Sequence, residues 1–276
     1  MSDLRPIGVF DSGVGGLSVL RAMRTELPTE NVVYFGDQSH VPYGPRPMAQ
    51  IQEFSWAITN FLIELGAKLI VVACNTASAA ALQLLRSTHP EIAFVGMEPA
   101  VKPAVEQTRT GKVGVLATPA TFQGELYGSV LERFASGVTV LQDTCPGLVG
   151  QIEKGDLTGP VTREILEQSL RRMVEHGIDT VVLGCTHYPF VIPLIREVAG
   201  PSIRVIDPAP AVARQVARVL RERGIQTPSA SRGTVRFITS GSPTALQRLL
   251  PLLMGEAGVV EPARWRGDSV LEMVDG

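Results

Sequence analysis

The feature that most constrains the fold is a regular alternation of short, β-branched apolar runs with longer amphipathic segments. The apolar runs predict strands near residues 5–10, 31–36, 68–73, 92–96, 112–117, 138–142, 179–184, 202–206 and 234–238. The segments between them have helical periodicity, and in AVARQVARVLRERG the apolar residues Val212, Val216, Val219 and Leu220 fall on one face. Alternating strands and helices predict an α/β fold with mostly parallel sheets and right-handed crossovers.

An internal repeat is visible among the predicted strands. IGVFDSGVGGL at 7–17 matches VGVLATPATFQ at 113–123. NVVYFGD at 31–37 matches GVTVLQD at 137–143 with the same shift along the chain, and two later pairs of strands keep nearly the same spacing. This order of matches predicts two similar, pseudo-symmetric α/β halves.

Proline-rich stretches mark the boundaries between these halves, at MEPAVKPAV (97–105) and IDPAPAV (206–212). We expect residues 1–98 and 208–276 to form a first α/β domain, and residues 99–207 to form a second. The last part of the chain would then pack back on the first half, and the active site would lie in the cleft between the two domains.

Composition excludes several classes of function. A formal net charge of −2 gives no electrostatic footprint for nucleic acid or an anionic membrane. No apolar run approaches the roughly 20 residues that span a bilayer, and the N-terminus enters a predicted strand without a signal-peptide apolar region. We therefore expect a cytoplasmic protein with neither a nucleic-acid nor a membrane partner.

The cysteines and histidines favour neither a disulfide framework nor a metal site. The chain has three cysteines, Cys74, Cys145 and Cys185, and their spacing contains no CxxC pair. The four histidines form no HxH or HExxH pair; they are His40, His89, His176 and His187.

Two of the cysteines occupy matching settings at predicted strand ends. Cys74 follows LIVVA and Cys185 follows DTVVLG, so both lie where open α/β sheets bind ligands. After Cys74 the segment NTASAAALQLL predicts a helix with Asn75 or Thr76 as its N-cap and its amides directed at the strand end. A single buried cysteine is commonly inert packing, but the matched pair favours a site with one thiol on each side, whereas Cys145 has no counterpart and is interpreted as structural.

The motif FDSGVGG (10–16) leaves one strand and opens a helix. Asp11 would lie at the strand tip, where Ser12 and the free amides could bind a carboxylate or phosphate. Asp11 could also orient or deprotonate a thiol, or simply cap the helix.

Dinucleotide binding is a competing interpretation of the same motif. Gly13, Gly15 and Ser18 resemble GxGxxG, and Asp37 follows at the end of the next predicted strand. The third glycine of the fingerprint is absent, which weakens this reading.

Two further groups lie within reach of the Cys185 side. His187 follows that cysteine by two residues and could exchange protons in the same cleft, although a packed or capping histidine is an equal alternative. Glu153 in VGQIEKGD ends a predicted helix, where a carboxylate is most often solvated.

Two loops complete the candidate site. VPYGPRP places Tyr43 and Gly44 over the same sheet edge. Thr118 and Thr121 in ATPATF occupy the position in the second half that Asp11 holds in the first. Loops rich in glycine, threonine and asparagine would hold the charged groups of a substrate and place its reacting carbon between the two sulfurs.

A pair of opposed thiols suits inversion of a carbon centre. One thiolate removes a proton from Cα, and the opposite thiol returns a proton to the other face. A single base would tend to restore the original configuration. A near-symmetric pair of halves suits this nearly symmetric task.

The motifs taken together resemble those of the glutamate racemases in the cofactor-independent aspartate/glutamate racemase superfamily. The resemblance rests on IGVFDSGVGGL, YFGDQSHVPYG, ACNTAS, ATPAT and GCTHYP, and runs from Pro6 to Pro210. It implies interconversion of L- and D-glutamate, which supplies D-glutamate for peptidoglycan, without pyridoxal phosphate or a metal. It also implies a small-molecule substrate and a homodimer.

The resemblance assigns roles to individual residues. Cys74 would work on the D-enantiomer with help from Asp11, and Cys185 on the L-enantiomer with help from Glu153 and His187. The implied substrate-binding residues are Asp11, Ser12, Tyr43, Gly44, Asn75, Thr76, Thr118, Thr121, Thr186 and His187.

Three alternatives stay open at this point. The first is another member of the superfamily, an aspartate or hydantoin racemase or a decarboxylase. The second is a nicotinamide-dependent oxidoreductase built on GVGGLS. The third is a non-catalytic binding protein with a regulatory role, since some members of the superfamily affect DNA gyrase.

Overall fold

Two mainly parallel sheets form the framework of the protein, and the computed structural model describes them within residues 3–267 and 269–274. The larger sheet has the strand order β11-β10-β9-β2-β1-β3-β4, and the smaller has the order β6-β5-β7-β8. The strands of the larger sheet are β1 (Ile7–Asp11), β2 (Val32–Gly36), β3 (Leu69–Val72), β4 (Ala93–Gly96), β9 (Val235–Thr239), β10 (Val260–Arg266) and β11 (Val270–Met273). The strands of the smaller sheet are β5 (Lys112–Ala117), β6 (Thr139–Asp143), β7 (Thr180–Gly184) and β8 (Arg204–Ile206).

The two sheets share one strand order. The order β2-β1-β3-β4 in the larger sheet is repeated as β6-β5-β7-β8 in the smaller one, and these are the strands that the sequence repeat pairs. Every pairing is parallel except that of β10 with β11. The predicted α/β class with two similar halves and mostly parallel sheets is confirmed.

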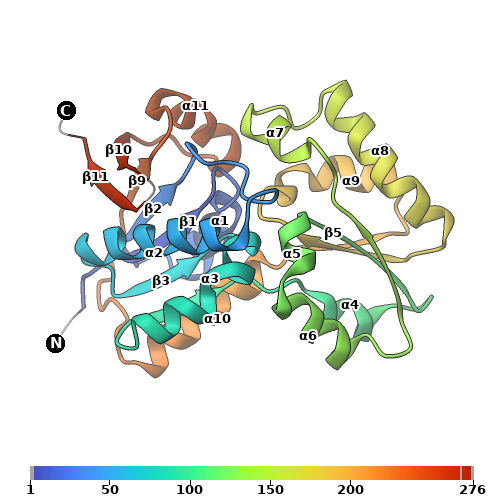
Figure 1. Ribbon diagram of the computed structural model, residues 1–276, viewed down its shortest axis with the longest axis horizontal. Helices are drawn as coiled ribbons and strands as arrows, with labels where there is room; N and C mark the ends of the chain where they lie inside the picture. The colour runs from blue at the N-terminus through green and yellow to red at the C-terminus, as the bar shows by residue number, and fades with distance from the viewer. Residues whose placement is uncertain (1–2, 268, 275–276) are drawn as a thin grey trace.

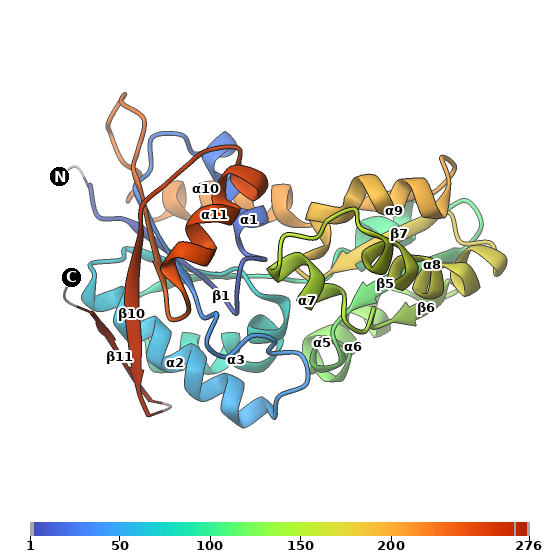
Figure 2. The same cartoon turned by 90° about the horizontal axis from the view of Figure 1, so that it is seen from above.

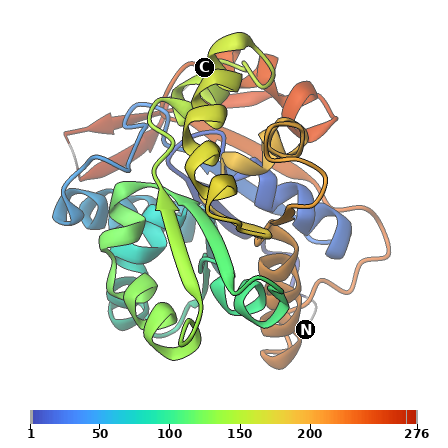
Figure 3. The same ribbon diagram turned by 90° about the vertical axis from the view of Figure 1, so that its right-hand side faces the viewer.

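Helices cover both sheets, and the chain forms two bodies side by side (Figure 1). The helices associated with the larger sheet are α1 (Leu17–Glu26), α2 (Met48–Glu64), α3 (Asn75–Thr88), α10 (Ala209–Glu222) and α11 (Pro243–Met254). The remaining helices are α4 (Val101–Gln107), α5 (Pro119–Gln123), α6 (Glu125–Phe134), α7 (Leu148–Glu153), α8 (Pro160–Glu175), the 3₁₀ helix η1 (Tyr188–Val191) and α9 (Ile192–Ala199). In Figure 3 the strands of the smaller sheet lie between the green helices and the yellow ones.

Successive residues of the central strands face opposite cores, which explains their continuous apolar character. In β1, Val9 packs in the core that includes α1, α10 and α11, whereas Phe10 packs in the core that includes α2 and α3. The strands of the smaller sheet are divided in the same way, with Val115 facing α4 and α6 and Leu116 facing the opposite core.

The C-terminal part of the chain packs on the first half. Helix α10 lies against α1, and β9 pairs with β2. Figure 2 shows β10 and β11 at the far end of the first body and α7 at the junction of the two bodies.

Strands β10 and β11 are absent from the sequence prediction. They form a hairpin at the edge of the larger sheet, where Arg264 and Arg266 are exposed and pair with Glu272. One face of this edge hairpin meets solvent and carries charged residues, so its sequence lacks the continuous apolar run by which the other strands were predicted.

Among the helices of the described residues, none combines the length and the apolar character that a membrane span requires.

Candidate active site

A small cavity lies where the carboxyl ends of β1 and β3 meet those of β5 and β7. Cys74 follows β3 and Cys185 follows β7, and both line this cavity. The full lining is Ser12, Pro42, Tyr43, Gly44, Cys74, Asn75, Thr76, Thr118, Val149, Cys185, Thr186 and His187. The volume open to the centre of a water molecule is about 10 Å³, which is room for about one water.

Cys74 begins helix α3 as its N-cap. Its sulfur accepts a hydrogen bond from the amide of Ala77 at 3.4 Å and lies 3.9 Å from Ser12 Oγ. The expectation of Asn75 or Thr76 as the cap was wrong, because the helix starts one residue earlier and the thiol itself caps it. Burial, together with the nearby Asp11 carboxylate, raises the pKa of the Cys74 thiol, so the thiol form predominates in the closed cavity.

Asp11 lies behind the cavity wall at the end of β1 and is fully buried. Its carboxylate accepts hydrogen bonds from the Gly13 amide at 2.8 Å and from Thr186 Oγ1 at 2.9 Å. Burial raises the Asp11 pKa, while the charge on His187 opposes that rise. Because Thr186 belongs to the second half, Asp11 also ties the two halves together beside Cys74.

Cys185 is in contact with a histidine–glutamate pair. Its sulfur lies 3.8 Å from His187 Nδ1, and His187 Nε2 lies 2.6 Å from Glu153 Oε1. Burial alone would lower the His187 pKa, but its bonds to Cys185 and Glu153 raise it well above 6.5. These contacts therefore favour the protonated, imidazolium form of His187 beside Cys185.

Glu153 lies at the end of α7 with 12% of its side chain exposed, and it reaches across to the first half. Its carboxylate accepts the Val14 amide at 2.8 Å and Gln38 Nε2 at 3.1 Å. Burial would raise the Glu153 pKa, but the bond and charge of His187 hold it below its usual value. The solvated alternative that the sequence left open for this residue does not apply.

A chain of hydroxyl groups crosses the other side of the cavity. Thr76 Oγ1 lies 2.8 Å from Thr118 Oγ1, which lies 2.9 Å from Thr121 Oγ1. Thr76 comes from the first half and Thr118 from the second, where it is the N-cap of α5. Thr121 is buried behind Thr118 and does not line the cavity.

Asn75 presents unused hydrogen-bonding capacity to the cavity. The residue is 3% exposed, and within the described residues neither its amide nitrogen nor its amide oxygen has a hydrogen-bond partner. Buried polar groups are normally paired. An unpaired side-chain amide in a cavity wall therefore indicates a binding group for a polar ligand.

Three residues at the site were not identified from the sequence. Pro42 and Val149 line the cavity, and Gln38 holds Glu153. Pro42 lies inside the loop that contains Tyr43 and Gly44, and Gln38 directly follows Asp37. In the sequence, only these neighbouring residues pointed to a role for Pro42 and Gln38. Val149 is an apolar residue on α7 and carries no signal of its own.

The space next to the glycine loop, where a dinucleotide would bind, is occupied by side chains of the second half. A Cβ built on Gly13 would overlap Glu153, and one on Gly15 would overlap His187 and Thr186. Ser18 Oγ donates to the Thr186 carbonyl at 2.8 Å. The glycines therefore serve close packing of the two halves. In the described residues, no group of three or more His, Cys, Asp or Glu side chains is arranged to hold a metal ion.

Comparison with known proteins gives one consistent result. The family model for Asp/Glu/hydantoin racemase matches residues 7–216. A glutamate racemase of Pseudomonas aeruginosa is 52% identical over 249 residues, which cover 90% of this chain and 94% of that protein.

Solved structures agree with this result. A glutamate racemase isoform of Bacillus anthracis has a TM-score of 0.85 at 32% identity, covering 94% of this chain and 97% of that chain. A glutamate racemase of Francisella tularensis in complex with D-glutamate has a TM-score of 0.82 at 30% identity, with the same coverage.

Proposed function

The chain belongs to the Asp/Glu/hydantoin racemase family, and we propose that Cys74 and Cys185 are the opposed acid/base pair with which it interconverts L- and D-glutamate. The chain acts as a glutamate racemase, an isomerase that supplies D-glutamate for peptidoglycan synthesis. One observation carries the assignment of the two cysteines. Each follows the equivalent strand of a repeated half, β3 or β7, and both line one cavity.

The proposed reaction has two proton transfers at Cα. A thiolate sulfur takes the Cα proton of one enantiomer, and the electron pair left on Cα is delocalised into the adjoining carboxylate. The opposite thiol then gives its proton to the other face of Cα. The enzyme ends each turnover with thiol and thiolate exchanged, so proton transfer to and from solvent resets it.

The surroundings of the two sulfurs assign a direction to each. His187 Nδ1 lies 3.8 Å from the Cys185 sulfur, whereas burial and the Asp11 charge raise the pKa of the Cys74 thiol. We therefore assign removal of the proton of L-glutamate to Cys185, assisted by His187, and protonation of the carbanion to Cys74. For D-glutamate, Asp11 would assist formation of the Cys74 thiolate.

The polar wall of the cavity suits the charged groups of glutamate. We assign substrate contacts to Asn75, whose amide is unpaired, and to the hydroxyl groups of Ser12, Thr76, Thr118 and Thr186. Tyr43, Gly44 and His187 complete the wall, while Asp11 and Thr121 support it from behind.

Substrate entry requires the two halves to separate. Glutamate is several times larger than the single water molecule for which the cavity has room. We propose that the bonds of Glu153, Asp11 and Thr118 across the cleft break on opening and re-form around the substrate. Closure then excludes water and strengthens the electrostatic stabilisation of the carbanion-like state.

The wider organisation of the protein is part of the proposal. We assign residues 1–98 and 208–276 to one domain and 99–207 to the other, supported by the division of the strands between two sheets. We also propose that the protein acts in the cytoplasm as a homodimer, in keeping with its synthesis of a cell-wall precursor.

Alanine variants of the three cysteines test the assignment. Cys74→Ala and Cys185→Ala should each abolish racemisation of both enantiomers while circular dichroism shows an intact fold. Cys145→Ala is the matched control and should retain racemisation, because Cys145 is buried outside the cavity. Full racemisation by either cavity variant would refute the two-base mechanism. Assays with L- and D-aspartate alongside glutamate separate this enzyme from an aspartate racemase.

A further inference from the structure

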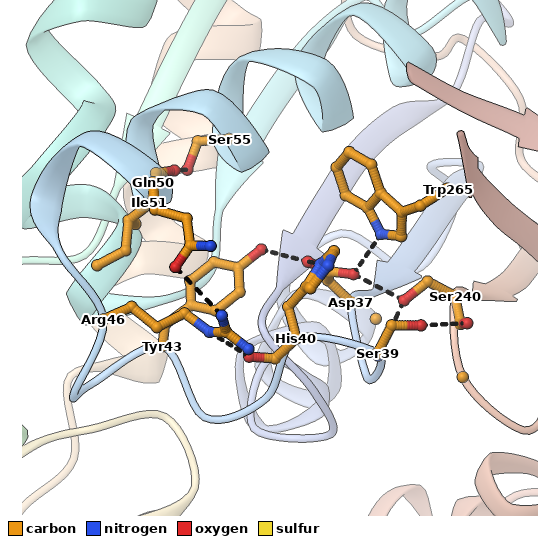
Figure 4. Close-up of polar contacts among 12 residues, drawn as sticks. Asp37, Ser39, His40, Tyr43, Arg46, Gln50, Ile51, Ser55, Ser240 and Trp265 are labelled. Atoms are coloured by element: carbon orange, nitrogen blue, oxygen red, sulfur yellow. Dashed lines mark hydrogen bonds and ion pairs between the residues drawn. The ribbon is translucent and has the colours of Figure 1, made fainter. Parts of the chain in front are cut away.

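Asp37, which directly follows β2, is fully buried and has four polar partners (Figure 4). Its Oδ2 accepts the Tyr43 hydroxyl at 2.6 Å and lies 2.9 Å from His40 Nδ1. Its Oδ1 accepts Ser240 Oγ at 2.7 Å and Trp265 Nε1 at 2.8 Å. Asp37 does not line the cavity and takes no part in the proposed proton transfers. The reaction alone therefore does not explain why this buried side chain has four polar partners.

The partners come from three separate parts of the chain. His40 and Tyr43 belong to the loop after β2, Ser240 follows β9, and Trp265 lies on β10. Strands β2 and β9 pair with Gly36 opposite Thr239, which brings the two strand ends together. Asp37 therefore joins the C-terminal strands to a loop that reaches the active-site cavity.

Aromatic packing around Phe54 restricts the same groups. The His40 ring stacks on Phe54 with centroids 4.0 Å apart and an interplanar angle of 10°. The rings of Trp265 and Tyr43 also contact Phe54, at 5.5 Å and 5.7 Å between centroids. Both the polar and the apolar contacts of Tyr43 thus depend on residues that Trp265 touches.

We propose that Asp37 and Trp265 are positioning residues that hold the Tyr43–Gly44 wall of the substrate cavity. Tyr43 and Gly44 both line the cavity, and the Gly44 carbonyl accepts the Ala120 amide of the other half at 3.3 Å. A shift of this loop would therefore move the wall relative to the bound substrate. The proposal rests on the glutamate racemase function and adds a role for the C-terminal hairpin in substrate binding.

The role predicts a specific kinetic pattern. The wall contacts substrate and transition state alike, so loosening it removes uniform binding, which raises KM and leaves kcat nearly unchanged. Trp265→Phe keeps an aromatic ring beside Phe54 but removes the N–H donor to Asp37 together with part of the ring volume. The loss of one hydrogen bond to a charged group should raise KM for both enantiomers about tenfold.

Trp56→Phe is a matched control for this variant. Trp56 and Trp265 are the two tryptophans of the chain, and Trp56 lies on α2 with 43% of its surface exposed, outside the cavity. This control should have the KM and kcat of the unmodified enzyme. If the control and the unmodified enzyme were both inactive on glutamate, the proposed function would fail before the role of Trp265 was reached.

Tyr43→Phe gives an independent measurement if Trp265→Phe folds poorly. It removes the hydroxyl that Asp37 accepts, so its KM should rise in the same way. In the double variant with Trp265→Phe, the fold-increase in KM should be well below the product of the fold-increases of the two single variants, because both changes release the same loop.

Fluorescence provides a readout that a purely structural role would not move. In Trp56→Phe the emission comes from Trp265 alone, and glutamate should change it saturably, with half-saturation near KM. The proposal would be overturned by a Trp265→Phe enzyme that loses thermal stability at unchanged KM, or by Trp265 emission that does not respond to saturating glutamate.

Discussion

Glu153 Oε1 lies 2.6 Å from His187 Nε2, and the same oxygen accepts the amide of Val14 from the other half. This oxygen therefore has two roles: its bond to His187 raises the pKa of the imidazole beside Cys185, and its bond to Val14 joins the two halves. The pKa of Glu153 is lowered and that of His187 is raised, so the pair favours its ionised form at neutral pH although only 3% of the His187 side chain and 12% of the Glu153 side chain are exposed.

Glu153→Gln removes the charge that sustains the imidazolium. The His187 pKa should fall, and kcat should drop by about 10²-fold, the low end of general acid–base effects. Since activity needs protonated His187, it is lost as pH rises through the His187 pKa. The high-pH limb of the kcat/KM profile should consequently move to lower pH in the variant. An unshifted limb would show that Glu153 does not act through His187.

The same pair gives the fold a pH-dependent stability. A raised histidine pKa contributes stability that is complete below the unfolded value of 6.5 and is lost as pH rises through the native pKa. A lowered glutamate pKa contributes stability that is complete above 4.5 and is lost as pH falls through the native pKa. The free energy of unfolding of Glu153→Gln should therefore fall furthest below that of the unmodified protein between pH 4.5 and 6.5. Urea unfolding across pH 3 to 10, roughly the span between the unperturbed carboxyl and lysine pKa values, would show this window; a difference independent of pH would contradict it.

Gly13→Ala should reproduce the catalytic defect without replacing an ionisable group. The added Cβ would overlap Glu153 Oε1 and push that carboxylate from His187. We expect kcat to fall by about 10²-fold, as when a catalytic group is misplaced by about 1 Å. Gly128→Ala on α6 is the control, because nothing lies within 4 Å of its new Cβ. That control should keep full activity and gain about 0.5–1 kcal/mol of stability, and parallel kinetics and thermal unfolding of both variants check the comparison.

Asn75→Ala should separate binding from stability. Removing a buried amide that has no partner among the described residues relieves an unpaired group, so the substrate-free protein should gain about 1 kcal/mol in free energy of unfolding. KM for glutamate should nevertheless rise about tenfold or more, because a polar group of the substrate loses its partner. Asn60→Ala on α2, outside the cavity, should change neither quantity of the enzyme in the same assays. A destabilised Asn75→Ala with normal KM would assign Asn75 to the scaffold.

Most of the fold could be predicted from the sequence because its strands are buried on both faces. Runs such as LIVV at Leu69–Val72 leave little ambiguity, and the repeat predicted equivalent strands in both halves. The β10–β11 hairpin could not be found in this way. Trp265 and Leu271 turn toward the protein while their neighbours carry charges to solvent, so the apolar signal is short and interrupted.

The candidate site was predictable where residues follow strands and less so where the two halves meet. Asp11, Cys74 and Cys185 come from strand ends, which the sequence locates directly. The bonds of Gln38 and Val14 to Glu153 depend on how the halves pack. Local sequence carries no information about that packing, so the capping role of the Cys74 sulfur and the contacts of Glu153 with the first half emerged only from the structure.

The most direct test of the two-base account is the position of deuterium at early times in heavy water, starting separately from L- and D-glutamate. With two opposed cysteines, each product enantiomer should carry solvent deuterium at Cα, while the remaining substrate carries almost none. Deuterium appearing equally in substrate and product from the first turnovers would show that one base serves both faces, and would contradict the roles given to Cys74 and Cys185.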